Sequence, residues 1–374
     1  MAGIYVHIPF CKTRCTYCGF FSTTSLQLRN DYVHALCQEL EQRKDYLHGA
    51  PVETIYFGGG TPTQLSLQQI GTILNAIYNI YNVRAEEITM ECNPDDLRGG
   101  LHDLRILGVN RLSIGIQTFN DTLLQTLHRR HTAAQAIAAV RGAQSVGFDN
   151  ISVDLMFGLP GQTMTDWEAD VAQALSLNIQ HLSAYSLMYE EGTPLAEQLS
   201  RGEIAETDEE TSLAMYEYLL DQTRAAGFEH YEISNFALPG RRSLHNSSYW
   251  RAIPYLGIGA GAHSFDGAAR QSNVCSLSAY IDGAKRGQIP AEHEAMSQTE
   301  KYDELILTAL RTCDGMNLGE LSRTFGPALH NYCLQNARQH IAQGRLRLDG
   351  NRLRLTRAGL FVSNDIMSDL MWSD

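Results

Sequence analysis

The stretch Tyr-Val-His-Ile-Pro-Phe-Cys-Lys-Thr-Arg-Cys-Thr-Tyr-Cys, residues 5–18, decides the fold and most of the chemistry of this chain. Its cysteines, Cys11, Cys15 and Cys18, have C-x3-C-x2-C spacing and follow a short apolar run. Three thiolates on one tight loop can bind three irons of a 4Fe-4S cluster and leave the fourth iron without a protein ligand. An open coordination position is a site for chemistry in metal centres generally. The spacing therefore predicts a 4Fe-4S cluster held by these three cysteines.

Two other uses of the cysteines compete with a cluster. Zinc binding needs four ligands, and His7 could supply the fourth. Disulfides are disfavoured, because eight cysteines in 374 residues without a signal peptide indicate a reducing compartment. The remaining cysteines lack metal-ligand spacing and mostly resemble small buried apolar residues. They are Cys37, Cys92, Cys275, Cys313 and Cys333.

The composition favours a soluble, cytoplasmic protein. The chain has 29 basic and 42 acidic residues, a formal charge of −13, which argues against a nucleic-acid partner for the molecule as a whole. No apolar stretch approaches the length of a membrane span, so we expect no stable membrane insertion. The first apolar run begins at residue 3, so we expect no targeting segment.

Six short apolar runs, each followed by a loop, alternate with stretches that have helical spacing of apolar residues. Strands that alternate with helices predict parallel βαβ units. The fold class is therefore α/β, with a partial (β/α)6-type barrel expected and an open doubly wound sheet as the alternative. Working residues of such barrels gather at the carboxyl ends of the strands. The runs are 3–8, 52–57, 87–92, 111–116, 151–157 and 181–187, and the helical stretches include 32–46, 67–78 and 133–146.

A change of pattern after about residue 298 predicts a second, smaller unit. Helical stretches lead into Arg-Leu-Arg-Leu-Asp-Gly-Asn-Arg-Leu-Arg-Leu, residues 345–355, whose alternation around Asp349-Gly350 predicts a β-hairpin. Helices followed by a hairpin indicate a small α+β, winged-helix-like module. Its basic and acidic residues are balanced, which favours a solvated face over a nucleic-acid surface. The expected helices are 207–226, 301–313, 317–324 and 327–343, with a further strand at 231–236. The expected division is a barrel domain (1–235), an irregular connecting segment (236–297) and the C-terminal module (298–374).

Candidate ligand-binding residues lie at the ends of the predicted strands. The run Gly58-Gly59-Gly60-Thr61-Pro62 follows one strand, and glycines there let the backbone approach a ligand closely. Glu91, Gln117 and Asp154 end or interrupt other strands, and Arg129 lies on a following helical segment. A carboxylate in a buried strand is costly without a partner. A ligand would supply one, and so would a structural ion pair of Arg129 with Asp154 or Glu91.

Together, the cysteine motif and the glycine loop resemble the radical S-adenosylmethionine (SAM) superfamily, in which SAM binds the open iron. Within it, the set resembles the coproporphyrinogen-dehydrogenase-like branch. This resemblance implies that Arg129 pairs with the SAM carboxylate, where a bidentate guanidinium fits well, and that acidic residues hold the ribose hydroxyls. The implied SAM contacts are Tyr5, Gly59, Gly60, Thr61, Glu91, Gln117, Arg129 and Asp154.

Further motifs resemble the haem chaperones of the oxygen-independent coproporphyrinogen-III oxidase-like family. They are Ser-Ile-Gly-Ile-Gln-Thr-Phe (113–119), Asp-Leu-Met-Phe-Gly-Leu-Pro-Gly-Gln (154–162) and His-Asn-Ser-Ser-Tyr-Trp (245–250). The resemblance covers essentially the whole chain. Two features differ from the oxidase itself: Phe20 stands where that enzyme has a further cysteine, and only a few residues precede the first expected strand, where the oxidase has an N-terminal extension.

The resemblance implies a chaperone that binds haem and passes it to a haem-accepting protein, such as a respiratory enzyme. His245 and Tyr249 are the candidate haem residues, since both residue types serve as axial ligands, although a lone histidine is more often structural. The alternative is a radical SAM oxidoreductase acting on a tetrapyrrole, an oxygen-independent coproporphyrinogen III dehydrogenase. Whether the protein is an enzyme stays open, and no catalytic residue is assigned. A tRNA-modifying enzyme, the third reading, would need a basic surface.

Overall fold

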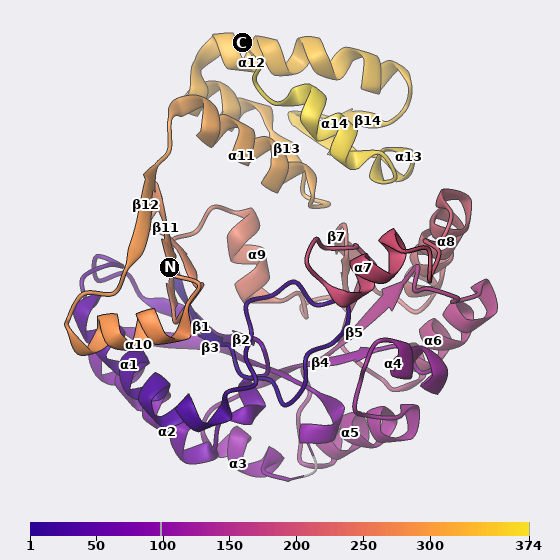
Figure 1. Cartoon of the computed structure of the whole chain (residues 1–374). Coiled ribbons are helices and arrows are strands. Elements are labelled where there is room, and N and C mark those ends of the chain that lie inside the picture. Colours follow the sequence, from indigo (N-terminus) through magenta and orange to yellow (C-terminus); the bar gives the residue numbers. More distant parts are fainter. Residues whose placement is uncertain (98, 374) are drawn as a thin grey trace.

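The computed structural model describes residues 1–97 and 99–373, and a curved sheet forms the centre of its larger part (Figure 1). Twelve strands of the described chain join in the order β12-β11-β10-β9-β1-β2-β3-β4-β5-β6-β8-β7. The neighbours from β1 to β6 are parallel and follow chain order without reversal, so the predicted partial (β/α)6 barrel is confirmed and the doubly wound alternative is wrong. These strands are β1 (Ala2–Ile8), β2 (Val52–Gly59), β3 (Val83–Cys92), β4 (Arg111–Gln117), β5 (Ile151–Phe157) and β6 (His181–Ser186).

Helices cover the outer face of this sheet (Figure 1). Side chains along β1 alternate between the two faces of the sheet, which explains this cover. Ile4, Val6 and Ile8 are fully buried on the helix side. Tyr5 and His7 face the barrel interior, where their side chains hydrogen-bond to each other. No helix in the described residues has the length and apolar character that a bilayer crossing requires. The helices are α1 (Arg29–Gln42), α2 (Leu67–Ile80), α3 (Leu101–Ile106), α4 (Asp121–Thr126), α5 (Ala133–Ser145), α6 (Met164–Ser176), α7 (Pro194–Ser200) and α8 (Glu209–Ala225), with 3-10 turns at Leu26–Leu28, Pro62–Gln64 and Pro94–Asp96.

Residues 229–297 differ from the sequence prediction. The single strand predicted over 231–236 is instead a hairpin of β7 and β8, which turns at Ile233-Ser234. The segment 236–297, predicted to be irregular, adds β9 in parallel to β1, and β10, β11 and β12 follow by antiparallel pairing. The partner of β9 is β1, more than two hundred residues away, and strands of three to five residues leave little pattern in the sequence. The elements are β7 (Glu229–Glu232), β8 (Asn235–Ala237), α9 (Leu244–Trp250), β9 (Tyr255–Ile258), β10 (His263–Phe265), β11 (Ala269–Asn273), α10 (Leu277–Lys285) and β12 (Ala291–Ala295).

The C-terminal unit has its own apolar core and a small sheet of β13, β15 and β14 over the described residues. The predicted hairpin is confirmed, with Asp349 opposite Arg352. The two helices predicted at 317–324 and 327–343 run together as α12, with a kink at Gly326, whose φ is 79°. Asp374, the end of the predicted module, lies outside the described residues, and the domain boundaries stay a prediction. The elements are α11 (Gln298–Leu310), β13 (Met316–Asn317), α12 (Leu318–Ala342), β14 (Leu346–Asp349), β15 (Arg352–Leu355), α13 (Arg357–Leu360) and α14 (Ser363–Leu370).

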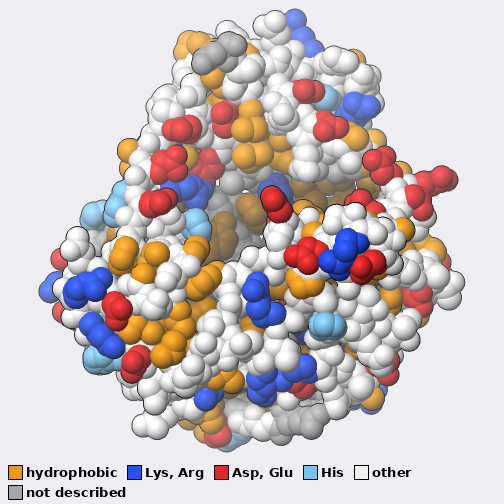
Figure 2. Space-filling view, in the orientation of Figure 1, with side chains coloured by type: hydrophobic (Ala, Val, Ile, Leu, Met, Phe, Trp, Pro, Cys, Tyr) orange, Lys and Arg blue, Asp and Glu red, His pale blue; other side chains and the backbone are white. Residues whose placement is uncertain are grey.

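The C-terminal unit contacts both outer edges of the curved sheet. Its first helix follows directly from β12, which is one edge strand. The segment after α11 then pairs with β7, the other edge strand, since Ile233 N donates to Arg311 O at 3.1 Å and Cys313 N donates to Tyr231 O at 3.0 Å. Figure 2 shows a recess between the barrel and this unit, with apolar side chains inside it.

Candidate functional site

The cysteine loop follows β1 at the carboxyl end of the sheet and lies across its middle (Figure 1). Its base is closed by two backbone hydrogen bonds, from Thr23 N to Pro9 O at 2.7 Å and from Cys11 N to Thr23 O at 2.9 Å. The side chains of Cys11, Cys15 and Cys18 are neither fully buried nor fully exposed. Burial raises the pKa of the Cys11 and Cys18 thiols. The loop therefore offers three accessible sulfurs at the open end of the barrel.

The glycine loop after β2 packs directly against the cysteine loop. Gly59 has a φ of 108°, and a Cβ there would lie 2.5 Å from the His7 ring. A Cβ on Gly60 would lie 2.8 Å from the backbone carbon of Pro9 and 3.0 Å from Cys11 Sγ. Any side chain at either position would displace the cysteine loop or the strand beneath it. Glycine is required here because the two backbones approach so closely.

A chain of polar contacts joins the loops that follow β1, β2, β3 and β4. Cys11 Sγ lies 3.6 Å from Thr61 Oγ1, which accepts a hydrogen bond from Asn93 Nδ2 at 3.0 Å. Arg129 Nη2 donates to Asn93 Oδ1 at 2.6 Å and to Gly115 O, and its Nη1 lies 3.4 Å from Cys15 Sγ. The chain thus begins and ends on cluster cysteines. Sequence reasoning missed Asn93, whose one signal was its place directly after a strand.

The same guanidinium has unused hydrogen-bonding capacity. Arg129 Nε is buried without a hydrogen-bond partner, and among the described residues Arg129 forms no salt bridge with Glu91 or Asp154. A buried donor without a partner is costly. An anionic group of a ligand at the cysteine loop would satisfy this donor, so the residues present fit a cofactor with a carboxylate.

Two partly buried carboxylates lie below the loops, Glu91 on β3 and Asp154 on β5, with β4 between them. Glu91 accepts hydrogen bonds from Tyr56 Oη at 2.7 Å and from Gly59 N at 3.1 Å. Asp154 accepts from Ser113 Oγ at 3.2 Å. Burial raises the pKa of Glu91 to about 7, an effect that the Tyr56 hydrogen bond opposes and the charge of Asp154 reinforces. Burial also raises the pKa of Asp154. Each would be stabilised by hydroxyl or amine donors from a ligand.

The two remaining predicted contacts lie at the same end of the barrel. Gln117 ends β4 with a φ of 73°, and its Nε2 and the Arg129 guanidinium both lie beside Gly115. The hydroxyl of Tyr5 shares a hydrogen bond with His7 Nδ1 at 3.1 Å. The structure therefore gathers the predicted SAM-contacting residues around one opening, although these contacts themselves stay a prediction.

His7 is already engaged and is a poor fourth ligand for zinc. Its Nε2 lies 3.1 Å from Phe21 O, and its Nδ1 shares the hydrogen bond with Tyr5. Burial lowers its pKa. In residues 1–97 and 99–373, no three metal-ligating side chains converge closely enough to bind a single metal ion. The assignment of the cysteines rests on their spacing and their place on the loop.

His245 lies deeper in the barrel than the cysteine loop. Its Nδ1 is 2.8 Å from Thr54 Oγ1, near the amino end of β2, and its Nε2 is 2.9 Å from Tyr249 Oη. The ring stacks on Tyr56 with centroids 5.1 Å apart, so Tyr56 separates it from Glu91. Burial lowers the pKa of His245 to about 3. His245 and Tyr249 thus lie together, but the structure does not bring them to the cysteines.

Glu87 fixes the helix that carries this histidine. Its carboxylate accepts hydrogen bonds from Leu244 N and His245 N, both at 3.0 Å, at the amino end of α9. Arg111, almost fully buried, lies 3.9 Å from the same carboxylate. Anions are favoured at a helix N-terminus by its unpaired N–H groups. Helix α9 is therefore anchored to the barrel interior.

Comparisons with known proteins agree with this geometry. The family model of the radical SAM superfamily matches residues 5–174, and that of the HemN C-terminal domain matches residues 296–362. The heme chaperone HemW of Bacillus subtilis is 35% identical over 371 residues, which cover 98% of each chain. HemW of Mycobacterium tuberculosis H37Rv is 33% identical over 99% of this chain and 94% of its own.

Two further relatives extend the comparison. The mitochondrial radical S-adenosyl methionine domain-containing protein 1 of Bos taurus is 33% identical over 99% of this chain and 87% of its own. The solved structure of coproporphyrinogen III oxidase (HemN) from Escherichia coli superposes with a TM-score of 0.85 at 22% identity, covering 99% of this chain and 90% of its own. That likeness shows the fold alone. With matches to HemW at 33–35% identity over nearly its full length, the chain belongs to the HemW family of the radical SAM superfamily.

Proposed function

We propose that the cysteine loop holds a 4Fe-4S cluster with SAM on its open iron. Cys11, Cys15 and Cys18 would bind three irons, and the chemistry supplied is one-electron reduction of the bound sulfonium. The unpartnered Nε of Arg129 supports a ligand carboxylate at this place. Because Gly59 and Gly60 have no side chains, their backbone groups can lie close to a ligand amine.

The protein uses this scaffold, in our proposal, to bind haem and transfer it to a haem-accepting protein. The observation that carries the proposal is the near-full-length similarity to heme chaperones HemW from several bacteria. Phe20, where the oxidase has a further cysteine, supports it, since this side chain is 68% exposed and cannot ligate metal.

His245 remains the predicted haem ligand, and its surroundings define what binding would require. The hydrogen bond between His245 Nε2 and Tyr249 Oη would have to break before that nitrogen could bind iron. Helix α9 would also have to move, because the ring is 1% exposed and lies beneath Tyr56. Haem binding at His245 would therefore require the segment 245–250 to open at the same time.

One anaerobic sample tests the proposal. Cluster-loaded protein is titrated with haem and followed by its Soret absorption, and His245→Ala is compared with His181→Ala. His181 is a matched control, because its ring is equally buried and hydrogen-bonded to Ser152 Oγ at 2.7 Å and Tyr231 Oη at 2.8 Å. Loss of binding in His245→Ala alone is expected. Equal binding in both variants would refute the ligand assignment, and no binding in the parent protein would refute the chaperone.

The second candidate is a radical SAM oxidoreductase that acts on a tetrapyrrole. It is supported by one observation, that Arg129 and the glycine loop lie against the cysteine loop at the open end of the barrel. Incubation of the same sample with dithionite, SAM and coproporphyrinogen III separates the two. We expect no protoporphyrinogen. Its formation would establish the oxidase activity, whereas SAM cleavage without it would retain the radical chemistry and exclude that reaction.

A further inference from the structure

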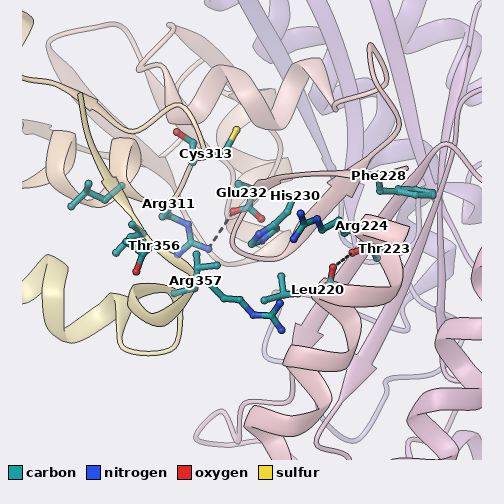
Figure 3. Close-up of a pocket in the computed structure, with 14 residues that line it drawn as sticks. Leu220, Thr223, Arg224, Phe228, His230, Glu232, Arg311, Cys313, Thr356 and Arg357 are labelled. Atoms are coloured by element: carbon teal, nitrogen blue, oxygen red, sulfur yellow. Dashed lines mark hydrogen bonds and ion pairs between the residues drawn. The ribbon is translucent and has the colours of Figure 1, made fainter. Parts of the chain in front are cut away.

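A cavity of about 300 Å³ lies where the C-terminal unit meets the edge of the barrel (Figure 3). One side is formed by α8 and β7 of the barrel, and the other by the end of α11, by β15 and by α13. None of the described residues that line it comes from the cysteine loop or from α9. It is therefore separate from the site described above.

The cavity contains buried polar atoms without hydrogen-bond partners. Glu232 is 2% exposed; its Oε1 accepts from Ser234 N and Asn235 Nδ2, but its Oε2 has no hydrogen-bond partner and lies 3.5 Å from Arg311 Nη2. Arg311 Nε is likewise buried and unpartnered. Buried polar groups in folded proteins are almost always hydrogen-bonded. Of these two atoms, Arg311 Nε is a donor that an anionic ligand would satisfy, whereas Glu232 Oε2 is an acceptor that keeps its ion pair with Arg311.

The charge of the lining is positive in a chain whose formal charge is −13. Its described lining includes three arginines, and two of them have carboxylate partners: Arg311 has Glu232, and Arg357 has Asp221. Arg224 forms no salt bridge within the described residues and is exposed at the cavity wall. One guanidinium in excess matches one negative charge on a ligand.

The rest of the lining is apolar. Leu220 and Leu310 are buried in it, and Phe228, Leu355 and Leu360 are partly buried. Pockets for small molecules combine such apolar walls with a few polar groups that fix orientation, and this one is at the lower end of their usual size. The lining fits a ligand that has one charged end and a short apolar body.

We propose that this cavity binds a small organic monoacid, with its carboxylate on Arg224 and Arg311 and its apolar part against Leu220, Leu310 and Leu355. The proposal is independent of the haem function. Because the ligand contacts α8 on one side and the C-terminal unit on the other, its binding stabilises the docking of the two parts against each other. Binding of such an acid would therefore control how tightly the C-terminal unit is docked on the barrel.

Cys313 gives a direct reading of occupancy, since it lines the cavity and is exposed. The alkylation rate of each cysteine is measured by peptide mass spectrometry on anaerobic, cluster-loaded, full-length protein, with octanoate as the probe. At about ten times its Kd, octanoate is expected to slow alkylation of Cys313 about tenfold. Cys37 is the internal control, because it lines a different cavity between α1 and α2.

Variants identify the charged contact. Arg224→Gln should raise the Kd for octanoate about tenfold, as loss of a charge-assisted hydrogen bond does, so that the same octanoate concentration slows alkylation of Cys313 only about twofold. Arg201→Gln, an exposed arginine on another surface, should leave it unchanged. The proposal is overturned if octanoate leaves Cys313 unprotected, if Arg224→Gln retains full protection, or if Cys37 is protected equally. Equal protection by inorganic phosphate would show a simple anion site and would also overturn it.

Discussion

Replacing Glu91 by glutamine should stabilise the protein in a pH-dependent way. The carboxyl is buried between Tyr56 and Gly59, and its pKa is raised from 4.5 to about 7. In the unfolded chain it ionises near its ordinary value, so between these two pH values the folded state holds a proton that the unfolded state has lost. Folding therefore becomes less favourable as pH rises through this window, and the cost is complete above the folded pKa.

The magnitude follows from the size of the shift. At 1.36 kcal/mol per pKa unit, the difference corresponds to about 3 kcal/mol near pH 8 and about 1 kcal/mol near pH 5. Glutamine has the shape of the acid and carries no charge, so it removes this pH-dependent cost, while its loss of one acceptor for Tyr56 or Gly59 is the same at both pH values. The advantage of Glu91→Gln over the parent protein should thus grow by about 2 kcal/mol from pH 5 to pH 8.

Urea unfolding at the two pH values measures this advantage, with Glu86→Gln as the control on the same strand. Glu86 is exposed, so its variant should track the parent protein at both pH values. An advantage of Glu91→Gln that is equal at both pH values, or that shrinks as pH rises, would show that the carboxyl is ionised at little cost and would refute the reasoning.

Three further predictions concern the cluster, the anchor of α9 and the kink in α12. Serine at Cys11, Cys15 or Cys18 should abolish the broad visible absorption of the reconstituted protein, whereas serine at Cys37 or Cys313 should not; an essential outlying cysteine would require a new assignment. Glu87→Gln should lower the free energy of unfolding by about 3 kcal/mol, because it leaves Arg111 without its buried partner, and a loss no larger than that of Glu86→Gln would contradict this anchor. Gly326→Ala should destabilise the protein by about 1 kcal/mol through its positive φ alone, since no neighbouring atom would meet the new Cβ. Gly142→Ala within α5 should instead stabilise it by up to about 1 kcal/mol. Urea unfolding measures both changes, and a change of the same sign in the two variants would disprove the account.

The parallel strands could be predicted because their signal is local. Each is a short apolar run followed by a loop and a helical pattern, and the observed β5 has the predicted bounds, 151–157. The prediction failed at a tight turn inside an apolar run, which the run itself does not mark. A single strand was expected over 231–236, but the chain turns at Ile233-Ser234, where Glu232 accepts hydrogen bonds from Ser234 N and Asn235 Nδ2.

The residues of the site also divide into those that the sequence predicted and those that it did not. Residues in recognisable motifs were found, because glycines and cysteines at fixed spacing have few alternative explanations. Asn93 was missed, since a single asparagine after a strand carries no motif, and its role depends on Thr61 and Arg129 arriving from other loops. The depth of His245 was also beyond sequence reasoning. Its partners, Thr54 and Glu87, belong to strands 191 and 158 residues earlier in the chain.

The attachment of the C-terminal unit to both edges of the open sheet bears on how the barrel avoids self-association. An edge strand exposes unpaired N–H and C=O groups that another chain can pair with. Here the backbone of residues 311–313 forms hydrogen bonds with the N–H and C=O groups at the open edge of β7. At the other edge, the chain passes directly from β12 into α11. A chain ending before residue 298 would leave β7 uncovered at one edge. We therefore expect the isolated barrel to form oligomers through β7, so that the C-terminal unit also keeps the protein monodisperse.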